Sequence, residues 1–357
     1  MDLMLDEIVQ QPAALADLRK YYESPGAISR RSVRGLAAHW PPTVVFTGMG
    51  SSLFAAYPAQ AYLASRGIRA VVWEAAELLH HHLGILRPDT LLVAVSQSGE
   101  TVEVTRLLER LPDKVAVAAV VNVERSTLAR RGGLLLPMMA GRQANVSTKT
   151  YVCSVAVLMY LAFAITNESH RYLTQVLLKA IHAQERILER HHLVMAPTVE
   201  FFNRPPYVAL MSRGPDMASA LQGAMMLKEV ARMGAEPISA AQFRHGPIEI
   251  VNPDHRYVVF ARQRQPDPRA RRSTSTGRLL LRLAKDIQSH GGKVLLLTDL
   301  PFPDTTNMRQ LRVESLKLGL GTLVDTVYMQ LLAHDVALRA GLEPGKFWIA
   351  EGVTRVE

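Results

Sequence analysis

Residues 91–101 have the sequence LLVAVSQSGET, and this stretch decides the fold. Its first half, Leu91 to Val95, is short and apolar and stops at a polar residue, as expected for a buried parallel strand. Its second half supplies three hydroxyls and a glycine just before a helical pattern that begins near Thr101. A strand that leads through a polar loop into a helix is the repeating unit of an α/β domain.

The same pattern recurs in both halves of the chain. In the first half the predicted strands are Val44 to Thr47, Ala70 to Trp73, Leu91 to Val95, Val115 to Val121 and Leu134 to Pro137. In the second half they are Tyr207 to Met211, Pro237 to Ala240, Tyr257 to Ala261, Lys293 to Thr298 and Leu311 to Glu314. We therefore expect two tandem α/β domains, each a parallel sheet flanked by helices in a flavodoxin-like three-layer sandwich.

Helical periodicity fills the remaining segments. Residues 148 to about 192 predict one continuous helix, and residues 323–340 predict a closing helix. The expected organisation is a helical segment over 1–38, a first domain over 39–165, a helical linker over 166–200, a second domain over 201–343 and a tail over 344–357.

Composition indicates a packed globular protein. The chain has 357 residues, of which 48% are hydrophobic and 20% charged. The most apolar stretch, Val152 to Ile165, contains Cys153 and Ser154 and is short for a membrane span, so we expect a buried core helix and no membrane partner. The lone cysteine excludes an intrachain disulfide, and the N-terminus lacks a secretory pattern. These features favour the cytoplasm.

The net charge of +9 is partly local. Residues 261–278, ARQRQPDPRARRSTSTGR, predict a solvated surface loop because such a composition cannot bury enough apolar surface to fold alone. The chain lacks zinc-ligand spacing and RNA-binding signatures, so we expect no nucleic-acid partner. The basic residues of this stretch are Arg262, Arg264, Arg269, Arg271, Arg272 and Arg278, against the single acid Asp267.

Polar loops follow two of the predicted strands, where parallel sheets place ligand sites. After the first strand comes TGMGSS, in which Gly48 and Gly50 permit close backbone approach and Ser51 and Ser52 supply hydroxyls. Such a loop alone is a common turn, and Ser96 or Ser98 alone could merely cap a helix.

A third hydroxyl cluster, residues 146–149, precedes the predicted linker helix. Together the three loops predict a phosphate site, since free amides and the dipole at a helix N-terminus favour anions. Three adjacent histidines, His80 to His82, predict no metal site, because consecutive helical residues point in different directions.

The hexapeptide SQSGET resembles the sugar-phosphate loop of SIS (sugar isomerase) domains. The whole chain is similar to the isomerase half of the glutamine:fructose-6-phosphate aminotransferases, also called glucosamine-6-phosphate synthases. The resemblance rests on MLDEIVQQP at 4–12, GMGSS at 48–52, SQSGETVEV at 96–104, NVSTKTY at 145–151, residues 221–247 and the terminal EGVTRVE.

The resemblance implies a sugar-phosphate site and implies no metal or cofactor. The residues that it places around the sugar phosphate are Gly50, Ser51, Ser52, Ser96, Gln97, Ser98, Thr101, Asn145, Ser147 and Glu351. Asn145 lies where the family usually has an apolar residue.

The resemblance also implies catalytic roles for Glu229, with Lys228 before it, and for His245. Glu229 matches the carboxylate that moves a proton between C1 and C2, and His245 matches a histidine proposed to open the sugar ring, often from a neighbouring subunit. A single carboxylate can take a proton from one carbon and return it to the next. The structural alternative for Glu229 is an exposed carboxylate paired with Arg232 at i+3.

Two features depart from the family. Met1 and Asp2 match the linker to the isomerase half and not the glutaminase domain, so we expect no glutaminase activity from this chain. The family carries a lysine shortly before a Val-Thr pair in its tail, where it can form a Schiff base. Here the tail is KFWIAEGVTRVE, and Glu351 or Gly352 occupies that place.

The sequence therefore predicts an aldose-ketose isomerase, or a related deaminase or deglycase, that acts on a phosphorylated sugar or amino sugar. Two alternatives stay open: a synthase-type aminotransferase that takes ammonia from solution or from a partner, and a sugar-phosphate-binding protein without turnover. We also expect a homodimer or a higher homo-oligomer.

Overall fold

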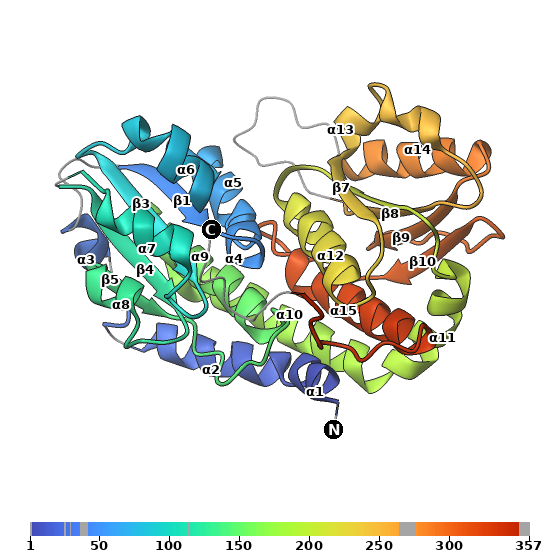
Figure 1. Ribbon diagram of the computed structural model, residues 1–357, viewed down its shortest axis with the longest axis horizontal. Coiled ribbons are helices and arrows are strands. Elements are labelled where there is room, and N and C mark those ends of the chain that lie inside the picture. Colours follow the sequence, from blue (N-terminus) through green and yellow to red (C-terminus); the bar gives the residue numbers. More distant parts are fainter. Residues whose placement is uncertain are drawn as a thin grey trace. The chain divides into compact units, whose positions relative to one another are not determined.

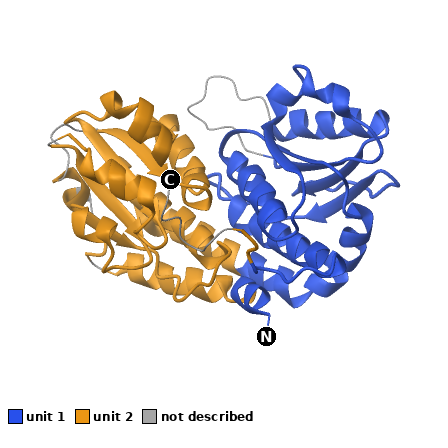
Figure 2. Ribbon diagram, viewed as in Figure 1, with its two compact units in different colours: residues 1–8, 182–346 blue, residues 9–181, 347–357 orange. Residues whose placement is uncertain are grey.

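The computed structural model describes residues 2–24, 26–28, 30–35, 42–112, 114–263 and 276–349. The chain divides into two compact units (Figure 2). Unit 2 comprises Val9–Ile181 and Phe347–Glu357, and unit 1 comprises Met1–Ile8 and His182–Lys346. Each unit is built around its own parallel sheet, as the strand and helix pattern predicts (Figure 1).

Unit 2 contains a five-stranded parallel sheet in the order β2-β1-β3-β4-β5. Each of the predicted strands of the first half is present, with its ends within one residue of the expected ones. The strands are β1 (Thr43–Gly48), β2 (Ala70–Glu74), β3 (Thr90–Ser96), β4 (Ala116–Val121) and β5 (Leu134–Pro137). The central strands β3 and β4 are buried along their whole length, which explains their continuous apolar runs.

Helices cover the sheet of unit 2. The short helices α6 (Ala75–His81), α7 (Val102–Glu109) and α8 (Thr127–Arg131) pack with one set of strand side chains in a buried cluster that includes Val45, Leu92 and Val117. The other helices of this unit are α2 (Gln11–Glu23), α3 (Arg30–Arg34), α4 (Ser51–Phe54), α5 (Tyr57–Ser65) and α9 (Lys149–Thr166).

The helix α9 is the apolar segment singled out in the sequence. It is long and apolar enough to cross a membrane, but 94% of its residues are buried inside the protein. It packs against α2, α3 and α5, and Cys153 in its first half is a buried free thiol. Its composition is therefore that of a core helix, as expected.

Unit 1 repeats the strand order of unit 2. Its five parallel strands lie in the order β7-β6-β8-β9-β10, so that in both sheets the second strand lies at the edge beside the first. They are β6 (Val208–Ser212), β7 (Ala235–Ser239), β8 (Arg256–Ala261), β9 (Lys293–Thr298) and β10 (Met308–Arg312). The helix α10 (His170–Glu189) begins in unit 2 and ends in unit 1. The other helices of unit 1 are α1 (Leu3–Val9), α11 (His191–Phe202), α12 (Met217–Glu229), α13 (Ala240–Phe243), α14 (Thr276–Ser289) and α15 (Thr322–Arg339).

The sequence-based prediction of the last strand began three residues too late. We expected it at 311–314, whereas β10 begins at Met308, which pairs with Val294 of β9. The strand lies at the edge of the sheet and has the sequence MRQLR, with polar side chains between its apolar ones. An apolar run therefore did not mark it.

The predicted continuous helix over 148–192 is wrong. The chain forms α9, α10 and α11 instead, because Asn167 adopts the left-handed conformation (φ 57°) and the chain leaves helical geometry again at Arg190. Asparagine tolerates that conformation better than most residues and often ends helices. Pro197 lies inside α11, which ends at Asn203 (φ 43°).

The prediction of a solvated surface loop over 261–278 is wrong at both ends of this stretch. The side chain of Arg262, directly after β8, is 3% exposed and donates hydrogen bonds to both carboxylate oxygens of Asp325 in α15. A Cβ at Gly321 would lie 2.5 Å from the Arg262 guanidinium carbon, so the glycine makes room for it. Arg278 belongs to α14. Residues 264–275, with the other arginines, lie outside the described part.

An ion pair in unit 1 predicts a pH-dependent stability. His334 in α15 is buried, with Nε2 2.5 Å from Oδ2 of Asp2 and Nδ1 2.8 Å from Oδ1 of Asp335. Burial alone would lower the pKa of His334, but the hydrogen bonds to the two carboxylates raise it overall. A raised pKa in the folded state means that the charged form stabilises the fold.

We expect this contribution to be complete below the ordinary histidine pKa of about 6.5 and to disappear as the pH rises through the higher folded-state value. The measurement is the free energy of unfolding by urea, for the wild type and for His334→Asn, between roughly pH 6 and 9. The difference between the two should shrink toward alkaline pH. A difference that grows with pH would contradict the assignment.

Candidate active site

The loop after β3 is organised by its own hydroxyls. Oγ of Ser96 accepts a hydrogen bond from the backbone N–H of Gly99 (3.0 Å) and shares another with Oγ1 of Thr101 (2.9 Å). Oγ of Ser98 accepts from the N–H of Glu100 (3.2 Å). The loop thus delivers three hydroxyls to the start of α7, whose first residues have no side-chain cap. Uncapped amides at a helix N-terminus are suited to an anion.

A second layer of contacts braces this loop against α8. The carbonyl of Gly99 accepts from the N–H of Leu128 (3.1 Å), and Oε1 of Glu100 accepts from the N–H of Thr127 (2.7 Å). Gly99 has φ +67°, and a Cβ there would lie 2.0 Å from Oγ of Ser126. The backbone path of the loop therefore requires glycine at this position.

If the 96–101 loop binds a phosphate, as the sequence predicts, Gly99→Ala should weaken that binding at least about tenfold, since both the conformation and the contact with Ser126 must change, at a cost of roughly 1–3 kcal/mol. The measurement is isothermal titration with fructose-6-phosphate. Gly67→Ala is the matched control, because Gly67 also has positive φ (+75°) but no atom lies within 4 Å of its added Cβ. Equal losses in both variants would contradict a specific role for the 96–101 loop.

The loop after β1 lies beside the loop after β3, because the two strands are neighbours in the sheet. A Cβ at Gly48 would lie 2.7 Å from the carbonyl oxygen of Val95, so glycine permits this close approach. Gly50 has φ +51° and leads into α4, whose first residues are Ser51, which is buried, and Ser52, which is half-buried. The structure thus brings together the first two of the predicted polar loops.

The third cluster is tied to Gln143. Oε1 of Gln143 accepts from the N–H groups of Thr148 (3.3 Å) and Thr150 (2.9 Å) at the start of α9. Oγ of Ser147 shares a hydrogen bond with Oγ1 of Thr150 (3.2 Å), and Asn145 is exposed. The side chain of Gln143 therefore binds backbone N–H groups that we expected from the sequence to be available to a phosphate.

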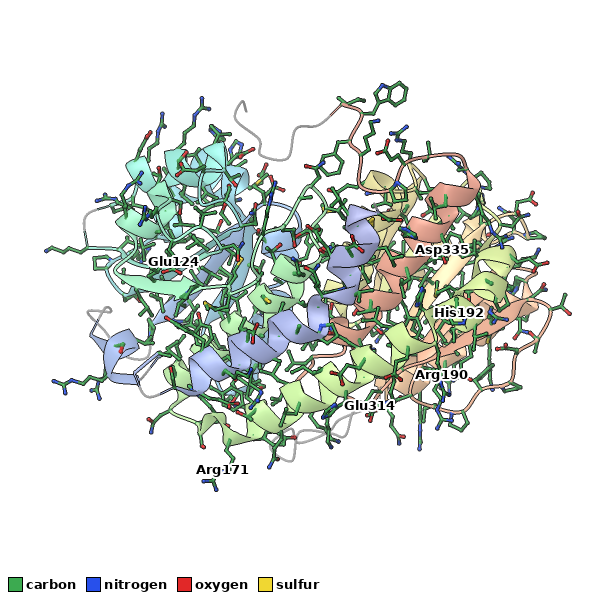
Figure 3. All side chains as sticks on the ribbon, turned by 90° about the horizontal axis from the view of Figure 1, so that it is seen from below. Glu124, Arg171, Arg190, His192, Glu314 and Asp335 are labelled. Carbon is green, nitrogen blue, oxygen red and sulfur yellow. The ribbon has the colours of Figure 1, made fainter. Side chains whose placement is uncertain are left out.

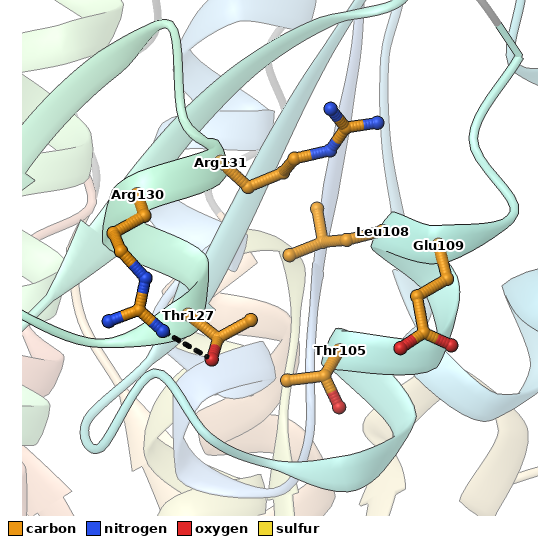
Figure 4. Close-up of a pocket in the computed structure, with 6 residues that line it drawn as sticks. All are labelled: Thr105, Leu108, Glu109, Thr127, Arg130 and Arg131. Carbon is orange, nitrogen blue, oxygen red and sulfur yellow. Dashed lines mark hydrogen bonds between the residues drawn. The ribbon is translucent and has the colours of Figure 1, made fainter.

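Sequence reasoning did not find a pocket between α7 and α8. It has a volume of about 420 Å³ and is lined by Thr105, Leu108, Glu109, Thr127, Arg130 and Arg131 (Figure 4). In it Nη2 of Arg130 donates to Oγ1 of Thr127 (3.1 Å), and Thr127 also braces the 96–101 loop. The two helices that form its walls are separate in the sequence, so no single motif indicated this pocket.

In unit 1, Glu229 is the last residue of α12 and is half-buried. Burial raises the pKa of this carboxyl to about 7. Within the described residues its carboxylate has no hydrogen-bond or ion-pair partner, and Arg232 instead donates to the carbonyl of Lys346 (3.5 Å). The structural alternative, in which Glu229 is an exposed carboxylate paired with Arg232, is therefore wrong. Lys228, the neighbour of Glu229, is exposed.

His245 lies in the turn after α13 and is exposed, while the preceding Phe243 anchors the turn in the core. Glu229 precedes β7 and His245 follows it, and no hydrogen bond joins the two side chains within the described part of the chain. The two side chains are therefore not paired with each other by a hydrogen bond within one chain. Glu351, the remaining predicted site residue, lies outside the described residues, as do Gly352 and Arg355.

Comparison with known proteins relates this geometry to a family. Residues 38–165 match the model of the SIS domain. The chain is 27% identical over 366 residues to a protein of Zymomonas mobilis named glutamine--fructose-6-phosphate aminotransferase [isomerizing], covering 95% of this chain and 56% of that protein. It therefore spans about half the length of this relative.

Solved structures agree on the fold. The C-terminal domain of glucosamine-fructose-6-phosphate aminotransferase from Francisella tularensis superimposes with a TM-score of 0.82 at 22% identity, covering 95% of this chain and 96% of that one. The tagatose-6-phosphate ketose/aldose isomerase from Escherichia coli does so with a TM-score of 0.80 at 16% identity, covering 96% and 95%. The match to the SIS-domain model covers residues 38–165, a region that includes the loops at 48–52 and 96–101.

Proposed function

We propose that this protein binds a phosphorylated sugar and moves a proton between C1 and C2 of a ring-opened hexose-6-phosphate. The reaction is that of an aldose-ketose isomerase or of a related aminosugar-phosphate deaminase or deglycase. The observation that carries the proposal is Glu229, a desolvated carboxyl without a charged partner among the described residues, whose pKa is raised to about 7.

A carboxyl of that kind suits proton transfer in both directions. At neutral pH the ionised and neutral forms are about equally populated, so the group can take a proton from C1 and deliver it to C2 through the enediol. An exposed carboxyl of ordinary pKa would be a much weaker base toward a carbon acid. Burial thus supplies the basicity.

The phosphate end of the substrate needs a site that fixes the sugar. The hydroxyls of Ser96 and Thr101 share a hydrogen bond and that of Ser98 accepts from the N–H of Glu100, and these three hydroxyls at the start of α7 support a phosphate site in unit 2. Glycines at 48 and 50 in the neighbouring loop permit close approach of the backbone. Fixing the phosphate orients C1 and C2 for the carboxylate.

We further propose that the working protein is a homo-oligomer in the cytoplasm. Ring opening needs an acid and base near neutral pH, a task suited to His245. Since His245 and Glu229 lie on either side of β7 in one chain and His245 is exposed, a second copy is the natural source of the histidine. A single buried cysteine suits a reducing compartment.

A second candidate is an aminotransferase of the glucosamine-6-phosphate synthase type, fed by ammonia from solution or from a partner. The name of the Zymomonas relative favours it. The tail position where the synthase family has its lysine holds Glu351 or Gly352, which favours isomerisation instead.

The test is to incubate the full chain with fructose-6-phosphate or glucosamine-6-phosphate, each with and without ammonium, and to follow products by ¹H NMR. Conversion of fructose-6-phosphate to glucose-6-phosphate without ammonium supports an isomerase. Glucosamine-6-phosphate formed only with ammonium supports the aminotransferase, and release of ammonium from glucosamine-6-phosphate supports a deaminase. Binding of both sugars without any product would contradict catalysis on these substrates.

A further inference from the structure

Unit 1 contains a pocket of about 370 Å³ beside the end of β10. The last turns of α10 and the first turns of α11 form one side, and α15 contributes Tyr328 to the other. Its floor is apolar and buried, with Ala183 3% exposed, Val313 5% and Tyr328 6%. The volume is that of a site for one small organic molecule.

The rim of this pocket is strongly basic. Three guanidinium groups, those of Arg186, Arg190 and Arg312, line it together with one carboxylate, Glu314, which gives a net charge of 3 − 1 = +2. Glu314 is already engaged, since its Oε2 accepts from Nη2 of Arg186 at 2.8 Å. Arg190 and Glu314 are both labelled in Figure 3 and line the pocket together.

The other two arginines have no such partner. Within the described residues, the side chains of Arg190 and Arg312 make no hydrogen bond or ion pair. Both arginines line the same pocket, so an anion bound there would be attracted by both guanidinium groups. Arginine is the residue best suited to bind a phosphate group through two parallel hydrogen bonds.

Tyr328 gives the pocket a fixed wall. Its hydroxyl donates to the carbonyl of Arg312 (3.2 Å), so the backbone that carries this arginine is held in place. Burial raises the pKa of Tyr328 to about 12, so the hydroxyl remains protonated at neutral pH. The side chains of Arg186, Arg190 and Arg312 are themselves exposed, so the basic rim is open to solvent and lies over a partly apolar base.

We propose that this pocket is a second ligand site, which binds a small phosphate monoester independently of the 96–101 loop. Arg190 and Arg312 hold the phosphate, and the organic part packs on the apolar floor formed by Ala183, Ile187 and Val313. The site takes no part in the proposed reaction, since it belongs to the edge of the second sheet, next to β10.

The test uses the full chain with ¹³C-labelled methyl groups on alanine and valine, so that Ala183 and Val313 report on the pocket directly. The probe is inorganic phosphate, followed by glucose-6-phosphate and glucose. We expect phosphate to shift both methyl signals to saturation, glucose-6-phosphate to do so at a lower concentration, and glucose to have no effect.

The variant Arg190→Ala with Arg312→Ala is expected to raise the phosphate concentration at half-saturation of these signals at least about tenfold. The control Arg282→Ala with Arg339→Ala removes the same charge from exposed helical positions of unit 1 and should leave it within about twofold. Equal effects of both double variants, or no saturable shift with phosphate, would overturn the proposal.

A short single-stranded DNA that shifts the same signals at lower concentration than glucose-6-phosphate would also overturn it, in favour of a nucleic-acid contact. Because the two methyl signals report on the pocket and not on turnover, failure here is distinguishable from failure of the proposed reaction. Catalysis without a shift refutes only the second site, and a saturable shift without catalysis refutes only the proposed reaction.

Discussion

Replacement of Glu229 by glutamine is expected to lower kcat for the interconversion of the sugar phosphates by about 10²- to 10⁴-fold, the usual contribution of a general acid-base residue. Glutamine keeps the size and polarity of the side chain but cannot accept the proton. Since the proposed phosphate site is in unit 2, the Kd for fructose-6-phosphate should change less than about threefold. The measurements are kcat by coupled assay and Kd by isothermal titration.

The pH profile adds a second readout. The pKa of Glu229, raised by burial to about 7, makes the base form scarce below neutrality, so kcat should rise as the pH increases through about 7. Glu200→Gln is the matched control, because Glu200 is an exposed helical carboxylate of the same unit. A Glu229→Gln protein with near wild-type kcat would refute the proposed role of this residue.

The largest expected loss of stability follows from Asp325→Asn. Asp325 and Arg262 are both fully enclosed, and Ser219 also donates to Asp325 (2.6 Å). Removing the carboxylate leaves the buried guanidinium with Asp216, 4.0 Å away, as its remaining ion-pair partner among the described residues. Breaking one side of a buried pair costs about 3–5 kcal/mol in the free energy of unfolding.

Asp286→Asn is the control for this prediction. Asp286 also pairs with an arginine of unit 1, Arg244, at 2.6 Å, but both side chains are more than a third exposed. An exposed pair contributes about 0–1 kcal/mol, so this variant should unfold close to the wild type. Urea denaturation of both variants measures the difference, and equal losses would contradict the importance of the buried pair.

The ion pair between Arg262 and Asp325 distinguishes the loop after β8 from the corresponding loop in unit 2. Arg262 directly follows β8. The strand β8 lies beside β6, the first strand of its sheet, just as β3 lies beside β1 in unit 2. The serines of the 96–101 loop follow β3. The buried guanidinium of Arg262 follows β8, and the carboxylate of Asp325 neutralises its charge. The repeated fold thus carries a hydroxyl-lined loop in one unit and an internal ion pair in the other.

Local features were predictable from the sequence. The strands follow apolar runs of four to seven residues, and the 96–101 loop is organised by hydrogen bonds within six residues of each other. Such patterns depend on neighbours along the chain. The polar edge strand β10 and the left-handed Asn167 were missed because neither has an apolar pattern or a glycine to mark it.

Features that depend on distant contacts were not predictable. Arg262 was assigned to a solvated loop because its partner, Asp325, lies 63 residues later in the chain. The capping of α9 by Gln143 and the arginine-rimmed pocket beside β10 likewise arise only when separate elements meet. The resemblance pointed to Glu229, but its raised pKa is a consequence of burial, which the sequence does not reveal.

The most direct test of the account is solvent deuterium incorporation. Fructose-6-phosphate is incubated in heavy water with the wild type and with Glu229→Gln, and deuterium at C1 and C2 is followed by NMR. The account predicts incorporation with the wild type and none above background with the variant. Wild-type protein that binds the sugar but incorporates no deuterium, or a variant that incorporates it at the wild-type rate, would contradict proton transfer by Glu229.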